Sequence, residues 1–255
     1  MSFSLVPGFA QRYPKTDEET VLLKEDAGQS RPHRESRLFI ESCCTDLDKA
    51  LAAEAGGACR IELCVDLAVG GLTPPRDLIS DVVSKLSIPV NVLVRPHADS
   101  FVYDEAALQQ IILDIGFCKS AGVAGIVVGA LTPEGTIDIP AMRRLVAASQ
   151  PLPVTFHRAF DVCSQDPFIA LDQVISLGCT RLLSSGQAPT AWDGRRVLAL
   201  MVRRAGKRLI VMPGRGVTPD NMEKLADATG ASEFHGTAIP GLCPEPPSPV
   251  LRFTR

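Results

Sequence analysis

No run of apolar residues in this 255-residue chain reaches the length of a membrane span, which takes about 20 such residues in a helix. The chain also shows no secretory signal peptide, and the acidic residues 17–19 argue against a mitochondrial presequence. We therefore expect a cytoplasmic protein with no membrane partner.

Positive charge is not in excess either. The chain carries 26 Lys and Arg against 29 Asp and Glu, for a formal net charge of −3. Because phosphate binding needs a basic surplus, this balance argues against a nucleic-acid partner.

The eight cysteines include no CxxC pair. This absence leaves a zinc ribbon or a thioredoxin-type redox motif without support. Most of the cysteines are expected to be small, buried hydrophobic residues.

Three segments differ in composition. Residues 1–36 are rich in charge, Pro, Gly and Ser without a sustained apolar period, which predicts a disordered N-terminal extension. Residues 37–238 alternate between short apolar runs and helical patterns, as one folded domain would. Residues 239–255 hold five prolines, a density incompatible with a helix, and are predicted to form an irregular tail.

The central segment contains eight candidate strands and seven candidate helices in alternation. The strands are expected at 37–43, 59–64, 89–95, 124–130, 153–158, 180–185, 208–212 and 232–236. The helices are expected at 45–56, 75–86, 104–121, 140–149, 166–177, 191–205 and 218–228. Eight such units in about 200 residues predict a parallel, closed (β/α)8 TIM barrel rather than an open doubly wound sheet. The proline-rich tail implies that its eighth helix is absent or atypical.

The first two strands end in the same Glu-x-Cys pattern, at Glu41 and Cys43 and at Glu62 and Cys64. Because side chains alternate along a strand, each Glu shares a face with its Cys. If both faces point into the barrel, the two thiols come within reach of one soft metal ion, and a thiolate pair suits Cu(I).

Simpler explanations exist for each of these residues. Cysteine is among the most buried residue types, so either thiol alone is explained by the core. The carboxylates are harder to explain, because an unpaired charge is costly to bury. Glu41 and Glu62 would either pair with Arg60, Arg95 or Arg158 or serve in acid–base chemistry or ligand recognition.

Further charged residues follow the third and fifth strands. His157 and Arg158 end the fifth strand and Asp161 follows them, a pattern that suits acid–base catalysis by His157 and anion binding by Arg158. Arg95 adds a second cation at the end of the third strand. A histidine taken alone is more often a hydrogen-bonded structural residue.

The late strands run into turns rich in glycine and serine. Ser185 follows the sixth strand, Gly214 and Gly216 the seventh, and His235 ends the eighth. Such turns bind phosphate in many barrels through backbone N–H groups, although glycine also serves tight turns for conformational reasons alone. We predict that these four residues contribute to ligand binding.

Several of these segments resemble the copper-homeostasis CutC family, in order along nearly all of 37–238. The matching segments are IESCC (40–44), GGACRIELC (56–64), VGGLTP (69–74), VRP (94–96), PVTFHRAFD (153–161), SSGQ (184–187), VMPGRGV (211–217) and EFHGTA (233–238). One departure follows the third strand, where members read Arg-Pro-Arg-Gly-Gly-Asp-Phe and this chain reads RPHADSF (95–101). The resemblance therefore does not extend to ligand binding by that loop.

The resemblance implies a cytoplasmic and sometimes nuclear (β/α)8 barrel that forms a homodimer or homotetramer. It also implies copper tolerance, with Cu(I) ligands that fall on Cys43 and Cys64. The first hypothesis is therefore a Cu(I)-binding homeostasis protein. The alternatives are an enzyme acting on a small anionic or sugar-like metabolite, and a purely structural or interaction module.

Overall fold

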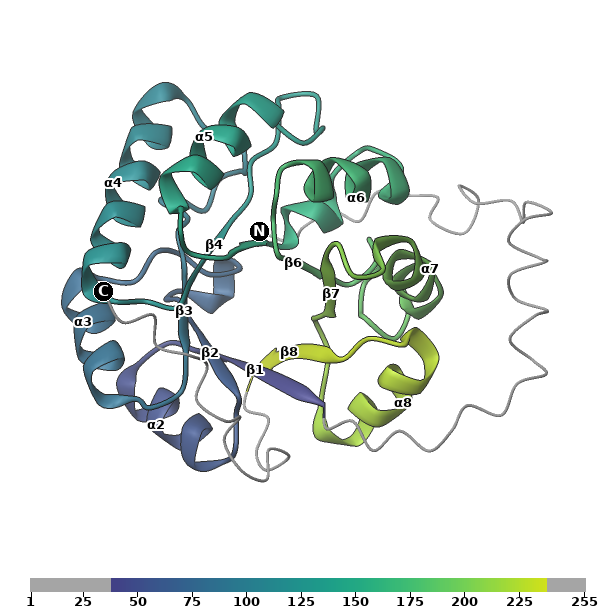
Figure 1. The fold of residues 1–255 in the computed structure, drawn as a ribbon, viewed down its shortest axis with the longest axis horizontal. Coiled ribbons are helices and arrows are strands. Elements are labelled where there is room, and N and C mark those ends of the chain that lie inside the picture. The colour runs from purple at the N-terminus through teal and green to yellow at the C-terminus, as the bar shows by residue number, and fades with distance from the viewer. Residues whose placement is uncertain (1–37, 238–255) are drawn as a thin grey trace. The chain divides into compact units, whose positions relative to one another are not determined.

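The computed structural model describes residues 38–237, which form a nearly closed barrel of eight parallel strands with helices around it (Figure 1). The strands are β1 (Phe39–Cys44), β2 (Arg60–Leu63), β3 (Val90–Leu93), β4 (Gly125–Val128), β5 (Val154–Phe156), β6 (Arg181–Ser184), β7 (Ile210–Pro213) and β8 (Glu233–Thr237). The predicted (β/α)8 barrel is confirmed.

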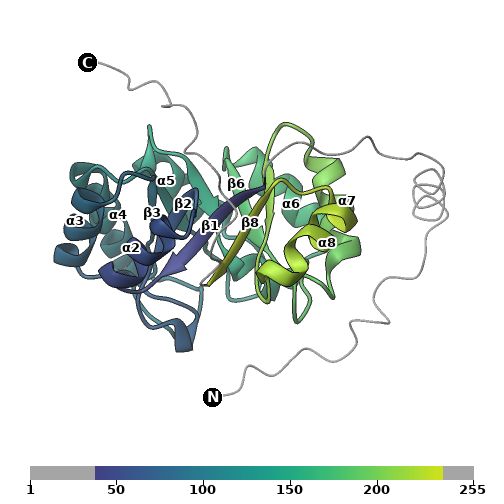
Figure 2. The same ribbon diagram turned by 90° about the horizontal axis from the view of Figure 1, so that it is seen from below.

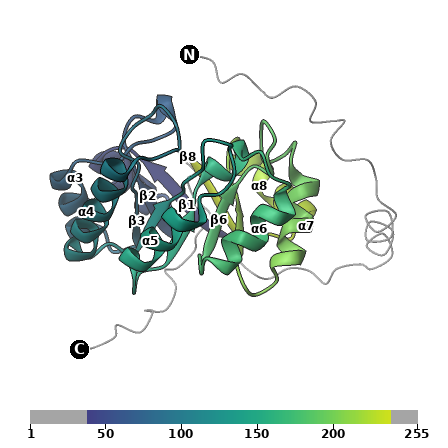
Figure 3. The same cartoon turned by 90° about the horizontal axis from the view of Figure 1, so that it is seen from above.

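One α-helix joins each strand to the next. The helices are α2 (Leu47–Ala55), α3 (Arg76–Lys85), α4 (Glu105–Ala121), α5 (Ile139–Ser149), α6 (Pro167–Ser176), α7 (Arg195–Ala205) and α8 (Pro219–Thr229). Two short 3-10 helices, η3 (Leu67–Val69) and η4 (Arg158–Val162), follow β2 and β5. Figure 3 shows α5 and α6 on the outside of the barrel.

Each strand from β1 to β6 pairs in parallel with the next one, and β1 also pairs with β8 (Figure 2). Among the described strands, no backbone ladder joins β7 to β8. The junction between β7 and β8, which we call the seam, is closed by side-chain packing. A Cβ on Gly214 would lie 2.4 Å from the Leu183 side chain and 3.6 Å from the Cβ of His235. Glycine is required there because neighbouring side chains occupy the space.

The strands are short and buried, as expected for a sheet covered on both faces. A large apolar core includes the buried sides of the helices, and a separate small cluster consists of Cys43, Cys64, Leu93 and Val127. The two candidate metal-binding thiols therefore belong to their own small cluster.

Most predicted elements differ from the structure by one or two residues at an end, and for β5 and α7 the difference has a local cause. The fifth strand stops at Phe156 instead of residue 158, because η4 follows it and the His157 ring accepts a hydrogen bond from the Ala159 N–H. Helix α7 begins at Arg195 rather than at residue 191, after a turn closed by the bond from Gly194 N–H to the Thr190 carbonyl.

The predicted N-terminal extension, the proline-rich tail and the atypical eighth helix lie outside the described residues. Within residues 38–237, no helix combines the length and the hydropathy needed to cross a bilayer.

Candidate functional site

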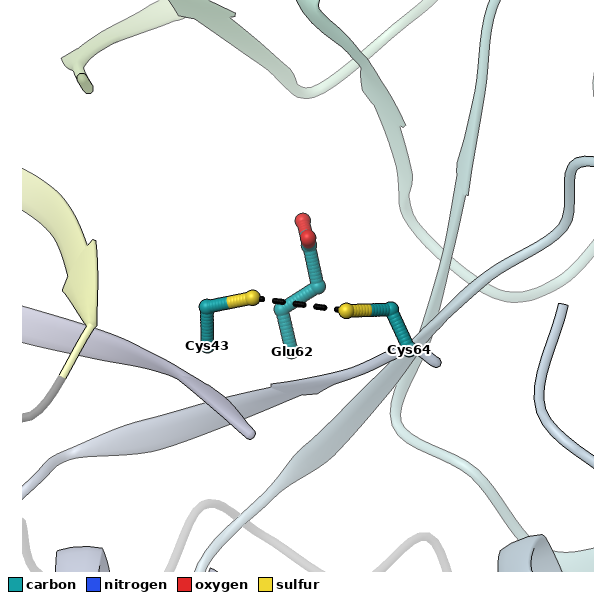
Figure 4. Close-up of side chains that lie close together, drawn as sticks. All are labelled: Cys43, Glu62 and Cys64. Carbon is teal, nitrogen blue, oxygen red and sulfur yellow. Dashed lines mark hydrogen bonds between the residues drawn. The ribbon is translucent and has the colours of Figure 1, made fainter. Parts of the chain in front are cut away.

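Cys43 and Cys64 lie side by side at the C-terminal ends of β1 and β2. Cys43 is in register with Glu62, and Cys64 follows two residues later. Their Sγ atoms are 3.5 Å apart and point toward each other (Figure 4). Both thiols are buried.

Cys43 holds its proton tightly. The hydrogen bond with Cys64 and then burial raise the pKa of the Cys43 thiol far above its usual range, and the Glu62 carboxylate adds to this effect. Cys43 is therefore a thiol at neutral pH, and any metal ion must displace its proton to bind the thiolate.

Glu62 stands beside the two sulfurs (Figure 4), with one ligand atom each from Cys43, Glu62 and Cys64 all within 4.8 Å of one another. Its Oε2 atom is buried and has no hydrogen-bond partner. Burial, with a contribution from Glu41, outweighs the opposing effects of His235 and Arg60 and raises the pKa of Glu62 to about 7. A buried acceptor without a partner is unusual and marks this carboxylate as available to a ligand.

Glu41 lies deeper in the barrel and is fully paired. Its Oε1 is 2.8 Å from His235 Nδ1, and its Oε2 accepts hydrogen bonds from Arg60 and, at 3.2 Å, from Asn91. Burial alone would raise the pKa of Glu41, but Arg60 and His235 outweigh it and lower the pKa to about 2. Glu41 is therefore a carboxylate that orients its neighbours.

His235 connects the two carboxylates. Ligand atoms of Glu41, Glu62 and His235 lie within 4.8 Å of one another, so Glu62 belongs to both groups that could hold a metal ion. Burial would lower the pKa of His235, but the Glu62 and Glu41 carboxylates outweigh it and raise the pKa. With Nδ1 held by Glu41, the Nε2 atom remains for a second interaction.

Below this cluster is an ion-pair network that the sequence did not predict as a unit. Arg60 bonds Glu233 at 2.8 Å, Glu233 also accepts from Arg181 at 2.8 Å, and the Arg60 guanidinium lies 4.6 Å from the centre of the Phe39 ring. The sequence signal for this network was one charged residue at the start of each of three buried strands, β2, β6 and β8. The network fixes Arg60, which in turn holds Glu41.

His157 lies elsewhere, at the end of β5. Its Nδ1 accepts the Ala159 N–H at 3.2 Å, so the neutral ring carries its hydrogen on Nε2, which is buried without a partner. Burial, and then Arg95, lower the pKa of His157 to about 3. The neutral ring is suited to donating a hydrogen bond rather than to charge-changing acid–base work near pH 7.

Asp161 binds the turn after β6. One of its oxygens accepts from Ser184 Oγ at 2.6 Å, from Ser185 N–H at 3.0 Å and from Gln187 N–H at 3.2 Å. The other is 3.0 Å from Arg158 Nε. The chain's own carboxylate therefore occupies the backbone N–H groups that a phosphate would use, although the Arg158 side chain is still 35% exposed.

The turn after β7 is shaped by its glycines. Gly216 has a φ of +72°, and its carbonyl accepts a hydrogen bond of 2.8 Å from the Asn221 amide of α8. The structure thus gives Gly214 and Gly216 conformational roles, and ligand binding there stays a prediction.

Arg95 is buried and bonds three backbone carbonyls. Its Nη1 donates to Val69 O at 2.9 Å and Gly71 O at 3.0 Å, and its Nη2 donates to Ala98 O at 2.9 Å. These bonds join the loop after β2 to the loop after β3. The barrel thus brings five predicted residues into one cluster (Cys43, Cys64, Glu62, Glu41 and His235), while Arg95 holds loops near it.

Comparisons with known proteins place this arrangement in a family. The CutC family model matches residues 38–240. The family protein CutC of Parabacteroides distasonis is 48% identical over 201 residues, which cover 78% of this chain and 82% of the relative. The family protein CutC of Xanthomonas campestris is 45% identical over 199 residues, which cover 78% of this chain and 82% of that relative.

A solved structure agrees with the sequence relatives. The crystal structure of CutC from Streptococcus agalactiae superposes with a TM-score of 0.75 at 33% identity and covers 79% of this chain and 99% of that one. This chain is a member of the CutC family.

Proposed function

We propose that this protein binds Cu(I) through Cys43 and Cys64 and serves in copper homeostasis. The observation that carries the proposal is the pair of buried thiols with Sγ atoms 3.5 Å apart on adjacent strands. The name of the Streptococcus agalactiae relative refers to copper homeostasis. Soft thiolate ligands favour Cu(I) over harder cations.

The spacing of the sulfurs suits a shared metal ion. Taking a metal–sulfur bond of about 2.3 Å, as for zinc, two sulfurs at a tetrahedral angle lie roughly 3.8 Å apart, and in a linear arrangement about 4.6 Å. The observed 3.5 Å therefore needs a modest opening of the pair. Rotation of the two side chains supplies it without a change in the strands.

Glu62 is the candidate for a third ligand or a nearby charge. It is the one residue that belongs both to the thiol group and to the group with Glu41 and His235. A carboxylate is a hard ligand, so we assign the affinity for Cu(I) to the two sulfurs.

The test is an anaerobic Cu(I) titration against a chromophoric chelator. We expect the wild type to bind one equivalent and a Cys43→Ser, Cys64→Ser double variant to lose it. The matched control is a Cys118→Ser, Cys179→Ser variant, which removes two buried thiols elsewhere and should bind as the wild type does. Equal affinity in both double variants would remove the proposal.

An enzymatic function is the second candidate, favoured by the hydrogen bond between Glu41 and His235. A carboxylate that orients a histidine leaves the other ring nitrogen for proton transfer. The substrate would be a small anionic or sugar-like metabolite, with the half-exposed Arg158 near its charge. A metabolite screen that yields neither a thermal shift nor turnover in the wild type would count against it.

The remaining proposals concern the cellular location, the domain bounds and the assembly of the protein. A reducing compartment keeps such thiols available, so we propose a cytoplasmic and nuclear protein. We also propose that residues 37–238 form the functional domain and that it assembles as a homodimer or homotetramer.

A further inference from the structure

A loop after β2 covers the Cys64 thiol. A Cβ on Gly71 would lie 3.5 Å from Cys64 Sγ and only 2.7 Å from Leu93 Cδ2, so the backbone of Gly71 packs directly over this cluster. Cys64 itself has no exposed surface. Any ligand that approaches Cys64 from this side must displace the loop.

The covering loop, residues 66–71, contains three residues in the left-handed region of backbone conformation. Gly70 and Gly71 have φ values of +91° and +92°, and Asp66, which is not a glycine, has a φ of +53°. Residues 66–70 are exposed, and an antiparallel bridge between Val65 and Leu72 closes the base of the loop. Backbone hydrogen bonds within the loop close a single short turn, so how the loop lies over Cys64 depends on a contact with the rest of the protein.

Arg95 supplies that contact from inside the protein. Its Nη1 atom binds the carbonyls of Val69 and Gly71, and its backbone N–H donates to Thr73 Oγ1 at 2.8 Å. Its guanidinium lies 4.6 Å from the centre of the Phe101 ring. No carboxylate among residues 38–237 forms a salt bridge with Arg95. Its two terminal nitrogens bind backbone carbonyls, and its buried Nε has no hydrogen-bond partner among these residues.

We propose that Arg95 is a positioning residue for the copper site: it holds residues 66–71 closed over Cys64 and thereby controls access to the thiol pair. The consequence for copper rests on the proposed function. The shielding of Cys64 is a property of the protein alone and can be measured without metal.

The first experiment measures the rate at which N-ethylmaleimide modifies each cysteine of the native, metal-free protein, read by peptide mass spectrometry. In Arg95→Met we expect Cys64 to react about tenfold faster, because local opening becomes easier. Cys118, buried in α4, is the internal reference for global unfolding. Arg76→Met, which removes an exposed arginine, is the control variant and should match the wild type.

A second variant tests the loop without removing a buried charge. Gly71→Ala should also speed the modification of Cys64, because the new methyl group collides with Leu93. Gly178→Ala is its control, since Gly178 has a φ of +80° but no atom within 4 Å of the added Cβ. The proposal is overturned if Cys64 reacts at the wild-type rate in both Arg95→Met and Gly71→Ala, or only in step with Cys118.

The metal readout is the rate at which Cu(I) passes from the loaded protein to a chelator. Arg95→Met should release Cu(I) several-fold faster than the wild type, and an unchanged release rate would contradict control of the copper site by Arg95. If the wild type binds no Cu(I), the proposed function fails, whereas the maleimide rates still decide whether Arg95 shields Cys64.

Discussion

Glu41 and Glu62 are both buried in the barrel, yet their pKa values move in opposite directions. Glu41 touches Arg60, Asn91 and His235, and its pKa falls to about 2. Glu62 has an oxygen without a partner, and its pKa rises to about 7. The difference lies in the charge of Arg60 and the hydrogen bonds that only Glu41 accepts, and it separates a structural carboxylate from one available to a ligand.

The raised pKa values of Glu62 and His235 predict that stability falls as pH rises from 6 to 8. Over this range Glu62 and His235 keep protons in the native state that the unfolded chain, with ordinary Glu and His pKa values, holds less tightly, so increasing pH favours unfolding. His157, whose pKa is lowered to about 3, has the opposite effect near pH 6, but it does so equally in wild type and in a Glu62 variant. Urea unfolding at pH 6 and pH 8 measures the effect. Glu62→Gln should reduce the difference, and an equal loss of stability in wild type and variant would contradict this origin.

Removing the charge of Glu41 should be costly. Glu41→Gln leaves the buried Arg60 without one of its carboxylates, and breaking such a pair costs about 3 kcal/mol or more of unfolding free energy. The control is Glu105→Gln, which breaks a solvent-exposed pair with Arg144 and should change stability little. Similar denaturation midpoints for the two variants would show that the buried network is not a major source of stability.

At the scale of the element, the turns around the barrel mouth are held by side chains from neighbouring units. Asp161, in η4 after β5, accepts hydrogen bonds from the turn after β6, and Arg95, after β3, binds the loop after β2. Each of these two loops therefore depends on a polar residue of a nearby unit.

Asp161→Ala should destabilise the protein by about 3 kcal/mol, because several buried donors lose their acceptor at once. Asp104→Ala is the matched control: Asp104 caps α4 through one bond to Ala107 N–H, and its loss should cost about 1 kcal/mol. Chemical denaturation measures both. A smaller loss for Asp161→Ala than for Asp104→Ala would contradict the role assigned to Asp161.

The elements themselves were largely predictable, because short apolar runs and helix caps are local signals. The C-terminal end of β5 and the start of α7 were not predictable. The hydrogen bond to a ring nitrogen of His157 decides the first boundary, and the close packing of Gly194 decides the second. The Glu-x-Cys repeat predicted the thiol pair from strand alternation. The bond between Arg60 and Glu233 spans 173 residues of sequence, and no local pattern reveals such a contact.

At the scale of the whole molecule, the barrel has one seam. Backbone pairing runs from β7 through β1 to β8, and the described strands show no ladder between β7 and β8. Strands with fewer interstrand hydrogen bonds open at lower free energy. The candidate metal group lies on β1 and β2, within the paired part of the sheet.

Amide hydrogen exchange should reveal this seam. We expect the amides of residues 210–212 of β7 to exchange faster than those of residues 125–128 of β4, which is paired on both sides. Mass spectrometry of peptides that cover the two strands measures the rates. Equal protection would indicate that the barrel is closed by hydrogen bonds in solution.

The central claim is that Cys43 and Cys64 together hold Cu(I). X-ray absorption at the copper edge, recorded on the protein loaded with one equivalent of Cu(I), tests it most directly. We expect two sulfur neighbours of the copper ion. They should disappear in the Cys43→Ser, Cys64→Ser variant and persist in the Cys118→Ser, Cys179→Ser variant. A copper site with only nitrogen and oxygen neighbours, or one unchanged in the first variant, would contradict it.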